Sequence, residues 1–337
     1  GIPWNNRLYS EHRRLSGRYL RREFSVPANK PIKHATATFC GLGFFDLHVN
    51  GRVVGELLMN PALTGYDKRV LYTTFDITQL MGAGENAVGV VLSNGRFFAP
   101  RLQNPMPMHS YGTPRAIGQI HIKYADGSTQ TIVTDDNWKL TTNGPLRASN
   151  EFDGEKYDAT MDMPGWSAPG FDDSSWQPAQ VVDAPGGQLE AQMVEPIRVT
   201  EVIKPVQLLQ PKPGVWMVDF GQAFYGVVQL SVRGPAGTRI SMRTSFNVLP
   251  NGMLNYTNDR SARNTDVYTL KGDGMEVWHP RFRGNATRWV QVEGFPGTPT
   301  KDNFAGLVTH TDHAAVGEFQ CSNELVNRTY RNARWGT

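Results

Sequence analysis

Three acidic residues at alternate positions offer the first chemistry in this sequence. Glu151, Asp153 and Glu155 stand in NEFDGEKYDA, and in an extended segment they would lie on one face of a strand. Hydrolysis of a glycosidic bond needs two carboxyl groups about 5 to 9.5 Å apart, a separation that such neighbours could provide. Charged strings are also common on solvated surfaces, and a solvated acidic edge is the favoured interpretation. We therefore assign no catalytic residue.

Two adjacent aspartates in GFDDSSW could form either a turn or a cation site. Asp172 and Asp173 precede Ser174, a pattern typical of an Asx-turn, and the turn would lead into a packed Trp176. Calcium, which takes several oxygen ligands and is often bound in loops of β-sandwiches, is the alternative. The turn is the prediction.

Aromatic residues beside turn signals form a third group, and they are the candidate sugar-binding residues: Tyr66, Phe97, Tyr111 and Trp166. Exposed rings stack on the apolar faces of sugars. Each ring taken singly is explained better by packing in a core or under a loop. Neither a G-x-S-x-G nucleophile motif nor a Gly-rich phosphate loop accompanies them.

Composition excludes several classes of partner. The chain has 34 Lys and Arg against 31 Asp and Glu with no block of like charge, so nucleic acid and membrane surfaces are not expected partners. No run approaches the roughly 18 apolar residues that span a bilayer. The cysteines, Cys40 and Cys321, are too few and too distant to indicate a disulfide framework.

The elements that must position these residues are short strands. In FFDLHVNGRVVG, Phe45, Leu47 and Val49 alternate with polar residues, and the Asn50-Gly51 pair predicts a hairpin. The same device recurs in QIHIKYADGSTQTIV and VVQLSVRGPAGTRISMR. The pattern predicts a mainly β protein built of antiparallel, jelly-roll-like sandwiches.

A cluster of Pro and Gly between residues 158 and 213 places the main boundary near Pro205. We predict a first sandwich with a long loop region over residues 1–205 and a second sandwich over residues 206–312. Residues 313–337 would form a linker and the start of a helical unit.

The last segment, CSNELVNRTYRNARWGT, has the pattern of an amphipathic helix. Ser322 is the expected N-cap, and Leu325, Val326, Tyr330 and Trp335 would form an apolar stripe. One helix cannot bury this stripe against itself. We therefore expect the stripe to pack on helices that these 337 residues do not include.

Several stretches share the order and spacing of one known family over nearly the whole chain. They are RYLRREF, GLGFFDLHVNGRVVGELLMNPALTGYDKRVLYTTFDIT, GENAVGVVLSNGRFF, GEKYDA, GWSAPGFDDSSW, EPIRV, VDFGQAFYGVV, DVYTLKGDGMEVWHPRF and GEFQCSNELVNRTYRNARW. Together they resemble the bacterial α-L-rhamnosidases of glycoside hydrolase family 78. Any one stretch would be a weak signal, whereas their combination is specific.

The resemblance implies a jelly-roll-like sandwich and a second β-sandwich, set ahead of an (α/α)6 barrel that carries catalysis with an inverting mechanism. The terminal helix would be the entry into that barrel, cut off after Thr337. The family's Asp-rich barrel motif, which ends in a Glu thought to act as general acid, does not occur in this sequence. The resemblance therefore carries over no catalytic residue.

Some family members carry a calcium-dependent rhamnose-binding module in the first sandwich. Glu56, which follows the VNGRVVG hairpin, could match the acidic residue of that module, and Asn104 is a poorer match for its Asn. Calcium accepts both side chains as ligands, so the resemblance makes Glu56 and Asn104 the metal candidates and calcium the one cofactor considered.

The resemblance implies that the chain is the accessory β part of an α-L-rhamnosidase, whose full-length parent releases terminal α-L-rhamnose from glycans with inversion. Its partners would be a rhamnose-containing glycan or glycoside and the catalytic barrel of the same protein. The alternative is a stand-alone, calcium-dependent rhamnose-binding module, and a purely structural scaffold is a third hypothesis. A periplasmic or secreted bacterial location is favoured over the cytoplasm.

Overall fold

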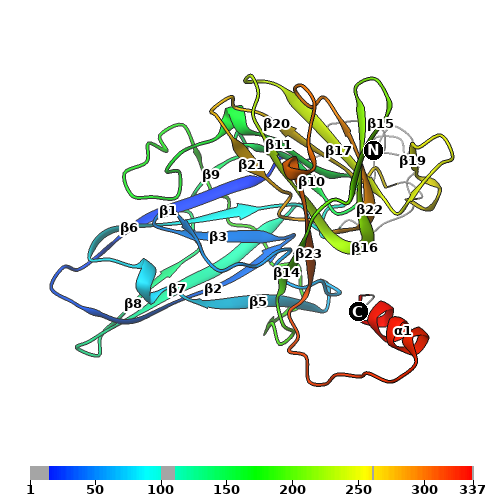
Figure 1. Ribbon diagram of the computed structural model, residues 1–337. Coiled ribbons are helices and arrows are strands. Elements are labelled where there is room, and N and C mark those ends of the chain that lie inside the picture. The colour runs from blue at the N-terminus through cyan, green and yellow to red at the C-terminus, as the bar shows by residue number, and fades with distance from the viewer. Residues whose placement is uncertain (1–14, 100–110, 260–261, 336–337) are drawn as a thin grey trace.

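The fold is mainly β, as the sequence predicted, and it has two lobes with separate apolar cores (Figure 1). A computed structural model of the chain describes residues 15–99, 111–259 and 262–335. The first lobe is a sandwich of two sheets, and the second is a single large sheet that folds around its own core. Helix α1 (Glu324–Trp335) follows the second lobe.

Two sheets face each other in the first lobe. One has the strand order β12 (Gln177–Pro178), β9 (Lys139–Thr141), β1 (Arg18–Val26), β6 (Gly84–Leu92), β3 (Phe45–Val49) and β4 (Arg52–Val53). The other has the order β13 (Gln188–Ala191), β5 (Arg69–Asp76), β2 (Ile32–Leu42), β7 (Arg115–Tyr124) and β8 (Thr129–Val133). All neighbours are antiparallel except β13 and β5, which run parallel.

The alternation in β3 sets the two sides of the first sheet. Phe45, Leu47 and Val49 are buried in the sandwich core, so the intervening side chains point out of the other face of the sheet. The hairpin to β4 is also confirmed, because Asn50 and Gly51 have φ angles of 50° and 80°, as a tight two-residue turn requires.

The second lobe is one ten-stranded sheet. Its main path runs through β10 (Leu146–Asn150), β11 (Gly154–Asp158), β20 (Thr265–Thr269), β17 (Arg239–Ser245), β22 (Asn285–Glu293), β16 (Val215–Val232), β23 (Phe304–Thr311) and β14 (Ile197–Ile203). Strands β15 (Gln207–Lys212) and β21 (Glu276–Trp278) pair with β16, and β18 (Asn247–Val248) pairs separately with β19 (Leu254–Asn255).

Strand β16 lets this sheet fold over its core. The strand has 18 residues, and a register irregularity between Asp219 and Phe224 interrupts its pairing with β22. Its first half pairs with β15, its second half pairs with β21 and β23, and β22 pairs with it on both sides of the irregularity. Both halves contribute buried side chains to one core, so the sheet wraps rather than extends flat.

The strands before residue 205 are divided between the lobes. Strands β10, β11 and β14 all precede this residue, yet they are hydrogen-bonded into the sheet of the second lobe. Strand β11 joins β20 by parallel pairing across more than a hundred residues of chain. The domain division at Pro205 stays a prediction, and the observed sheets draw on both sides of it.

Helix α1 stands apart from both lobes at the end of an extended segment that leaves β23 (Figure 1). The expected N-cap was wrong by one residue: Asn323 Oδ1 accepts from the N–H groups of Leu325 and Val326 at 3.0 and 3.4 Å. Leu325 is 72% exposed, and Tyr330 contacts Phe319 of the preceding segment with ring centroids 5.5 Å apart. Leu325, Val326 and Trp335 of the apolar stripe are thus exposed, by 72%, 43% and 37%. Within the described residues no helix has the length and apolar character of a membrane span.

Candidate functional site: a cavity between the lobes

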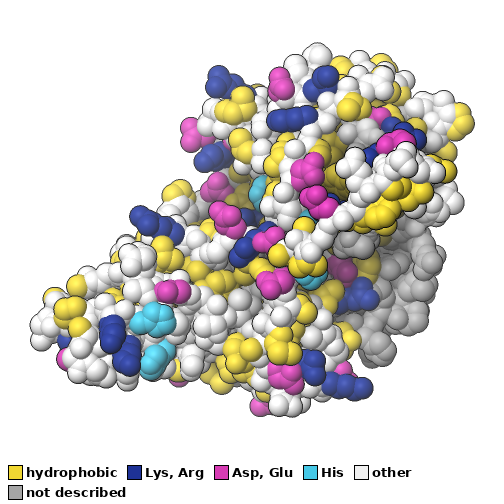
Figure 2. Space-filling view, turned by 60° about the horizontal axis from the view of Figure 1, so that its bottom comes forward, with side chains coloured by type: hydrophobic (Ala, Val, Ile, Leu, Met, Phe, Trp, Pro, Cys, Tyr) yellow, Lys and Arg dark blue, Asp and Glu magenta, His cyan; other side chains and the backbone are white. Residues whose placement is uncertain are grey.

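A cavity of about 430 Å³ lies where the outer face of the first sheet meets the second lobe. Its lining includes residues of strands β1, β3 and β11, the segment from Asp162 to Ser167, and the segment from Trp278 to Phe282. Figure 2 shows acidic, basic and histidine side chains gathered in the hollow between the lobes.

Trp166 forms one aromatic wall of the cavity. Its ring contacts the rings of Tyr19 and His48, with centroids 5.3 and 4.9 Å away. Gly89 of β6 makes this position possible, because a Cβ there would lie 2.5 Å from Trp166 Cζ3. Gly89 pairs with His48 in the sheet, so the indole lies on the outer face beside that imidazole. The side chain stays half-buried and reaches the cavity.

Arg21 holds the Trp166 loop against the sheet. Its side chain is only 1% exposed, and its Nε donates to the Trp166 carbonyl at 2.8 Å. The guanidinium also donates to the Ala168 carbonyl at 3.0 Å and pairs with the carboxylates of Glu23 and Asp173. Five donors on a rigid fork allow one arginine to fix a loop at several points.

The two aspartates of this loop have structural contacts. Asp172 Oδ1 accepts from Ser174 N–H at 3.0 Å, which confirms the Asx-turn. Asp173 pairs with Arg21 and, at 2.6 Å, with Lys139 Nζ. In the part of the chain that the structure describes, no group of three or more His, Cys, Asp or Glu side chains could hold a metal ion.

Ion pairs supply the charged part of the cavity wall. Asp46 of β3 binds Arg281 of the second lobe in bidentate fashion, with Nε–Oδ2 and Nη2–Oδ1 distances of 2.5 and 3.1 Å. Asp162 accepts from the Tyr157 hydroxyl at 2.9 Å and lies 3.9 Å from Lys271 Nζ. Each acidic group thus has a basic neighbour, and the first pair also connects the lobes.

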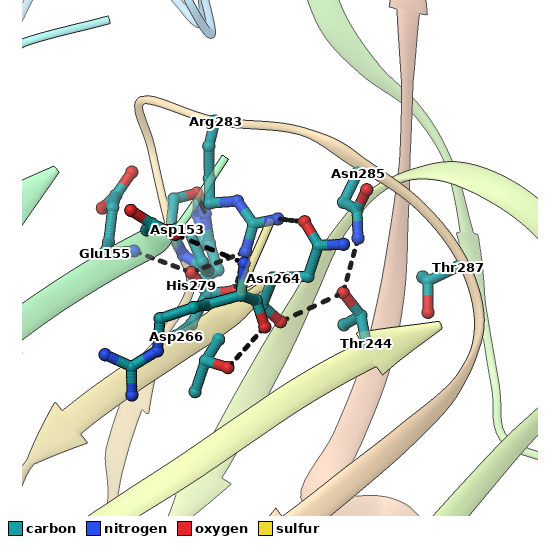
Figure 3. A network of polar contacts seen from close by, with 12 residues as sticks. Asp153, Glu155, Thr244, Asn264, Asp266, His279, Arg283, Asn285 and Thr287 are labelled. Carbon is teal, nitrogen blue, oxygen red and sulfur yellow. Dashed lines mark hydrogen bonds and ion pairs between the residues drawn. The ribbon is translucent and has the colours of Figure 1, made fainter. Parts of the chain in front are cut away.

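Glu155 joins the cavity to a buried polar network that Figure 3 shows. Its Oε1 accepts from the N–H groups of Arg281 and Phe282 at 3.0 and 2.5 Å. Its own N–H donates to Asp266 Oδ1 at 2.9 Å, and both Asp266 oxygens accept from Arg283 Nη1 at 3.0 and 2.9 Å. The interpretation of a solvated acidic edge was therefore wrong for two of its three residues, since Asp153 and Glu155 are buried.

Burial keeps three titratable groups of the wall uncharged at neutral pH. It lowers the pKa of His48 to about 4 and lowers the pKa of His279, so both imidazoles are neutral. Burial, with the nearby charge of Asp266, raises the pKa of Glu155 to about 8, so its carboxyl is mostly protonated at pH 7. Because the other charges are paired, the cavity is close to electroneutral.

The candidate sugar-binding residues fall into two places. Trp166 lines the cavity, whereas Tyr66, Phe97 and Tyr111 form a cluster elsewhere in the first lobe, with centroid distances of 5.0 to 5.8 Å. Tyr66 and Phe97 are fully buried, which favours a packing role for both, and Tyr111 is 40% exposed. Sugar contact by the four residues stays a prediction. Burial disfavours it for Tyr66 and Phe97.

The metal candidates stay predictions as well. Glu56 is exposed just after β4, and Asn104 lies outside the described residues. No acidic, His or Cys group of metal-binding size surrounds Glu56 within the described ranges.

Sequence reasoning missed the polar residues of the cavity. The alternation in β3 did place Asp46 and His48 on one face, but it could not show that this face meets the second lobe. His279 and Arg281 stand in EVWHPRF, which carried the family resemblance without a role for either residue.

Comparisons with known proteins agree on one family. Residues 30–201 match the family model described as "Alpha-L-rhamnosidase N-terminal domain". Residues 209–310 match the model described as "Bacterial alpha-L-rhamnosidase concanavalin-like domain". An α-L-rhamnosidase of Streptomyces avermitilis is 36% identical over 319 residues, which are 94% of this chain and 31% of that protein. One from Formosa agariphila is 31% identical over 327 residues, covering 94% of this chain and 34% of that protein.

Solved structures give the same result. The α-L-rhamnosidase of Dictyoglumus thermophilum matches with a TM-score of 0.90 and 39% identity over 95% of this chain and 35% of that one. The Streptomyces avermitilis enzyme, solved in complex with L-rhamnose, matches with a TM-score of 0.90 and 35% identity over 96% of this chain and 31% of that one. The chain spans about a third of the length of these relatives. With one family model over about half of the residues and a second one after it, the chain belongs to the bacterial α-L-rhamnosidases and carries their N-terminal and concanavalin-like domains.

Proposed function

We propose that this chain is the accessory β part of an α-L-rhamnosidase. The observation that carries the proposal is the order of the two family matches, which together extend from residue 30 to residue 310, while relatives are about three times longer. In the whole protein the catalytic groups would then lie in sequence that this chain does not contain.

The reaction proposed for the whole protein is release of terminal α-L-rhamnose from a glycan or glycoside by single displacement with inversion. An inverting glycosidase needs one carboxylic acid at the leaving oxygen and one carboxylate that activates water. Two carboxyls of the cavity are unsuited to these roles. Asp46 is held in a bidentate pair with Arg281, and Glu155 Oε1 is occupied by two backbone N–H groups.

Helix α1 supports the idea of a further helical partner. Leu325 is 72% exposed and Val326 43%, although the helix is capped by Asn323 and has a clear apolar side. Burial of such side chains stabilises a helix, because short isolated helices are marginal in water. We propose that this side packs against helices of the catalytic domain in the whole protein.

An activity measurement tests the proposal. The 337-residue chain and a full-length protein that contains it would be given an aryl α-L-rhamnoside. We expect hydrolysis only from the full-length protein. NMR of the released sugar should show that the anomeric configuration is inverted. Turnover by the chain alone at enzymatic rates, of the order of 1 per second or more, would show that catalysis resides in these residues and refute the assignment.

A further inference from the structure

We propose that the cavity between the lobes binds one neutral sugar ring, stacked on Trp166 and hydrogen-bonded by the histidines of the wall. The ligand class is a neutral monosaccharide or the terminal unit of a neutral glycan. The proposal concerns a binding site built from the described residues of this chain, and it holds whether or not the whole protein is a rhamnosidase.

The first support is a fixed aromatic surface. Trp166 is seated on Gly89 and tied to the sheet through its own carbonyl by Arg21, so it is positioned before a ligand arrives. Sugars present apolar C–H faces that pack on such rings, and a preorganised ring loses little side-chain freedom on binding. Tyr19, whose ring meets Trp166 edge-on at 87°, closes one side of this surface.

The second support is a set of polar groups with unused hydrogen-bonding capacity. His279 Nδ1 lies 2.9 Å from the Pro280 carbonyl and must donate to it, which leaves Nε2 as an acceptor. The His48 imidazole contacts the Trp166 ring and makes no side-chain hydrogen bond among the described residues. The Tyr19 hydroxyl accepts from Leu146 N–H at 3.2 Å and retains its proton for a further bond. Hydroxyl groups of a sugar can both donate to and accept from such groups.

The third support is the charge of the cavity. Both histidines are neutral, Glu155 is mostly protonated at pH 7, and Asp46 is neutralised by Arg281. A charged ligand would lose its hydration without gaining an opposite charge in this wall. A neutral polyhydroxylated ligand has no such penalty.

The fourth support is size. A volume of about 430 Å³ falls in the range of roughly 300 to 1,000 Å³ that is usual for small-molecule sites. Such sites also lie preferentially where two structural units meet, as this one does. The wall combines aromatic rings with a few polar groups, which is the composition expected of a sugar site.

Titration calorimetry on the 337-residue chain tests the proposal. The ligands would be neutral pyranoses, among them L-rhamnose and L-fucose, and their methyl glycosides. Each would be added at about 10 mM, so that a site with a Kd of about 1 mM is nearly filled. We expect at least one of them to bind, and D-glucuronate to bind at least tenfold more weakly than D-glucose. Free sugars and methyl glycosides distinguish recognition of a free sugar from recognition of a glycan end.

Substitutions at two positions, Trp166 and His279, report on the site. Trp166→Ala should weaken binding at least tenfold, and Trp166→Phe should recover part of the loss. His279→Phe keeps a ring of similar size and removes the acceptor nitrogen, so it should weaken binding about fivefold even if Trp166→Ala does not fold. Phe246→Ala, which removes an exposed ring that does not line the cavity, is the matched control and should leave affinity unchanged within about twofold.

Any one of three results would overturn the proposal. The first is that no neutral sugar binds, and the second is that the uronate binds more tightly than its neutral counterpart. The third is that the two single variants, His279→Phe and Trp166→Phe, both bind with the affinity of the wild-type chain. None of them bears on hydrolysis by the full-length protein. If the full-length protein proved not to be a rhamnosidase, the calorimetric result would still stand. Failure of the sugar-binding proposal and failure of the proposed function are therefore distinguishable.

Discussion

Glu155→Gln should raise the free energy of unfolding above that of the wild type by more at pH 7.5 than at pH 5. The folded pKa of Glu155 is about 8 against 4.5 for the free group, so the native state retains a proton that the unfolded state loses. The stability that this group contributes is complete below pH 4.5 and is lost as pH rises through the folded pKa. Between pH 5 and pH 7.5 the loss amounts to about 3 kcal/mol, at 1.36 kcal/mol per pH unit where only the unfolded state is ionised.

Glutamine is a suitable replacement because it keeps the contacts of the neutral acid. Its Oε1 can accept from the N–H groups of Arg281 and Phe282, as the carboxyl oxygen does. It has no proton to lose, so the variant lacks this part of the pH dependence. The stabilising difference between variant and wild type should therefore grow by about 3 kcal/mol from pH 5 to pH 7.5.

Urea unfolding at the two pH values, followed by circular dichroism, measures this difference. Glu56→Gln, which removes an exposed carboxylate, controls for the loss of one charge. If the free-energy difference between Glu155→Gln and wild type is the same at both pH values, Glu155 is ionised in the folded protein. The argument that burial keeps this wall neutral would then be refuted.

Four further outcomes are expected. Arg283→Met should lower the free energy of unfolding by about 3 to 5 kcal/mol, because it leaves the buried Asp266 without its cationic partner, and the double variant with Asp266→Leu should recover most of the loss in urea unfolding. Gly89→Ala places a Cβ 2.5 Å from the Trp166 ring, so we expect a loss of about 1 to 3 kcal/mol and weaker sugar binding in calorimetry. Leu325→Glu on α1 should change the stability of this chain by less than about 0.5 kcal/mol in thermal unfolding, since that side chain is 72% exposed. Chelation of calcium should leave the sugar affinity unchanged in titration calorimetry; a loss would favour the alternative site at Glu56 and Asn104.

Local patterns in the sequence predicted much of the first lobe. The alternation in β3 fixes which side chains enter the sandwich, and the Asn50-Gly51 turn fixes its hairpin, because both depend on neighbours in the chain. The same alternation says only on which side Asp46 lies. It cannot show that Arg281, far along the chain, meets this side.

The acidic segment, residues 151–155, shows the same limit, because its burial also depends on residues far along the chain. Glu155 looks exposed in the sequence because its neighbours are polar, but Gly154 allows β11 to lie directly against β20. A Cβ at Gly154 would be 2.1 Å from the Thr265 carbonyl oxygen. That contact joins residues more than a hundred positions apart, and it buries the carboxyl. No local period reports on pairing of this kind.

The terminal helix was predicted for a sound reason and with a wrong cap. Both Ser322 and Asn323 are good N-cap residues, and one position of difference is within the usual uncertainty of helix ends. The exposed apolar side followed from the spacing of its residues, which depends only on the helical repeat.

The sheet of the second lobe begins and ends with strands that the chain makes before residue 205: β10 and β11 at one end and β14 at the other. An expression clone that starts after this residue would leave β20 and β23 as bare edges, with unpaired backbone groups that invite aggregation. A fragment that stops there would carry β14 without its partner β23, and β11 would keep β10 but lose β20. The segments matched by the two family models are therefore unsuitable as separate building blocks for domain exchange, and a chimaera should transfer both together.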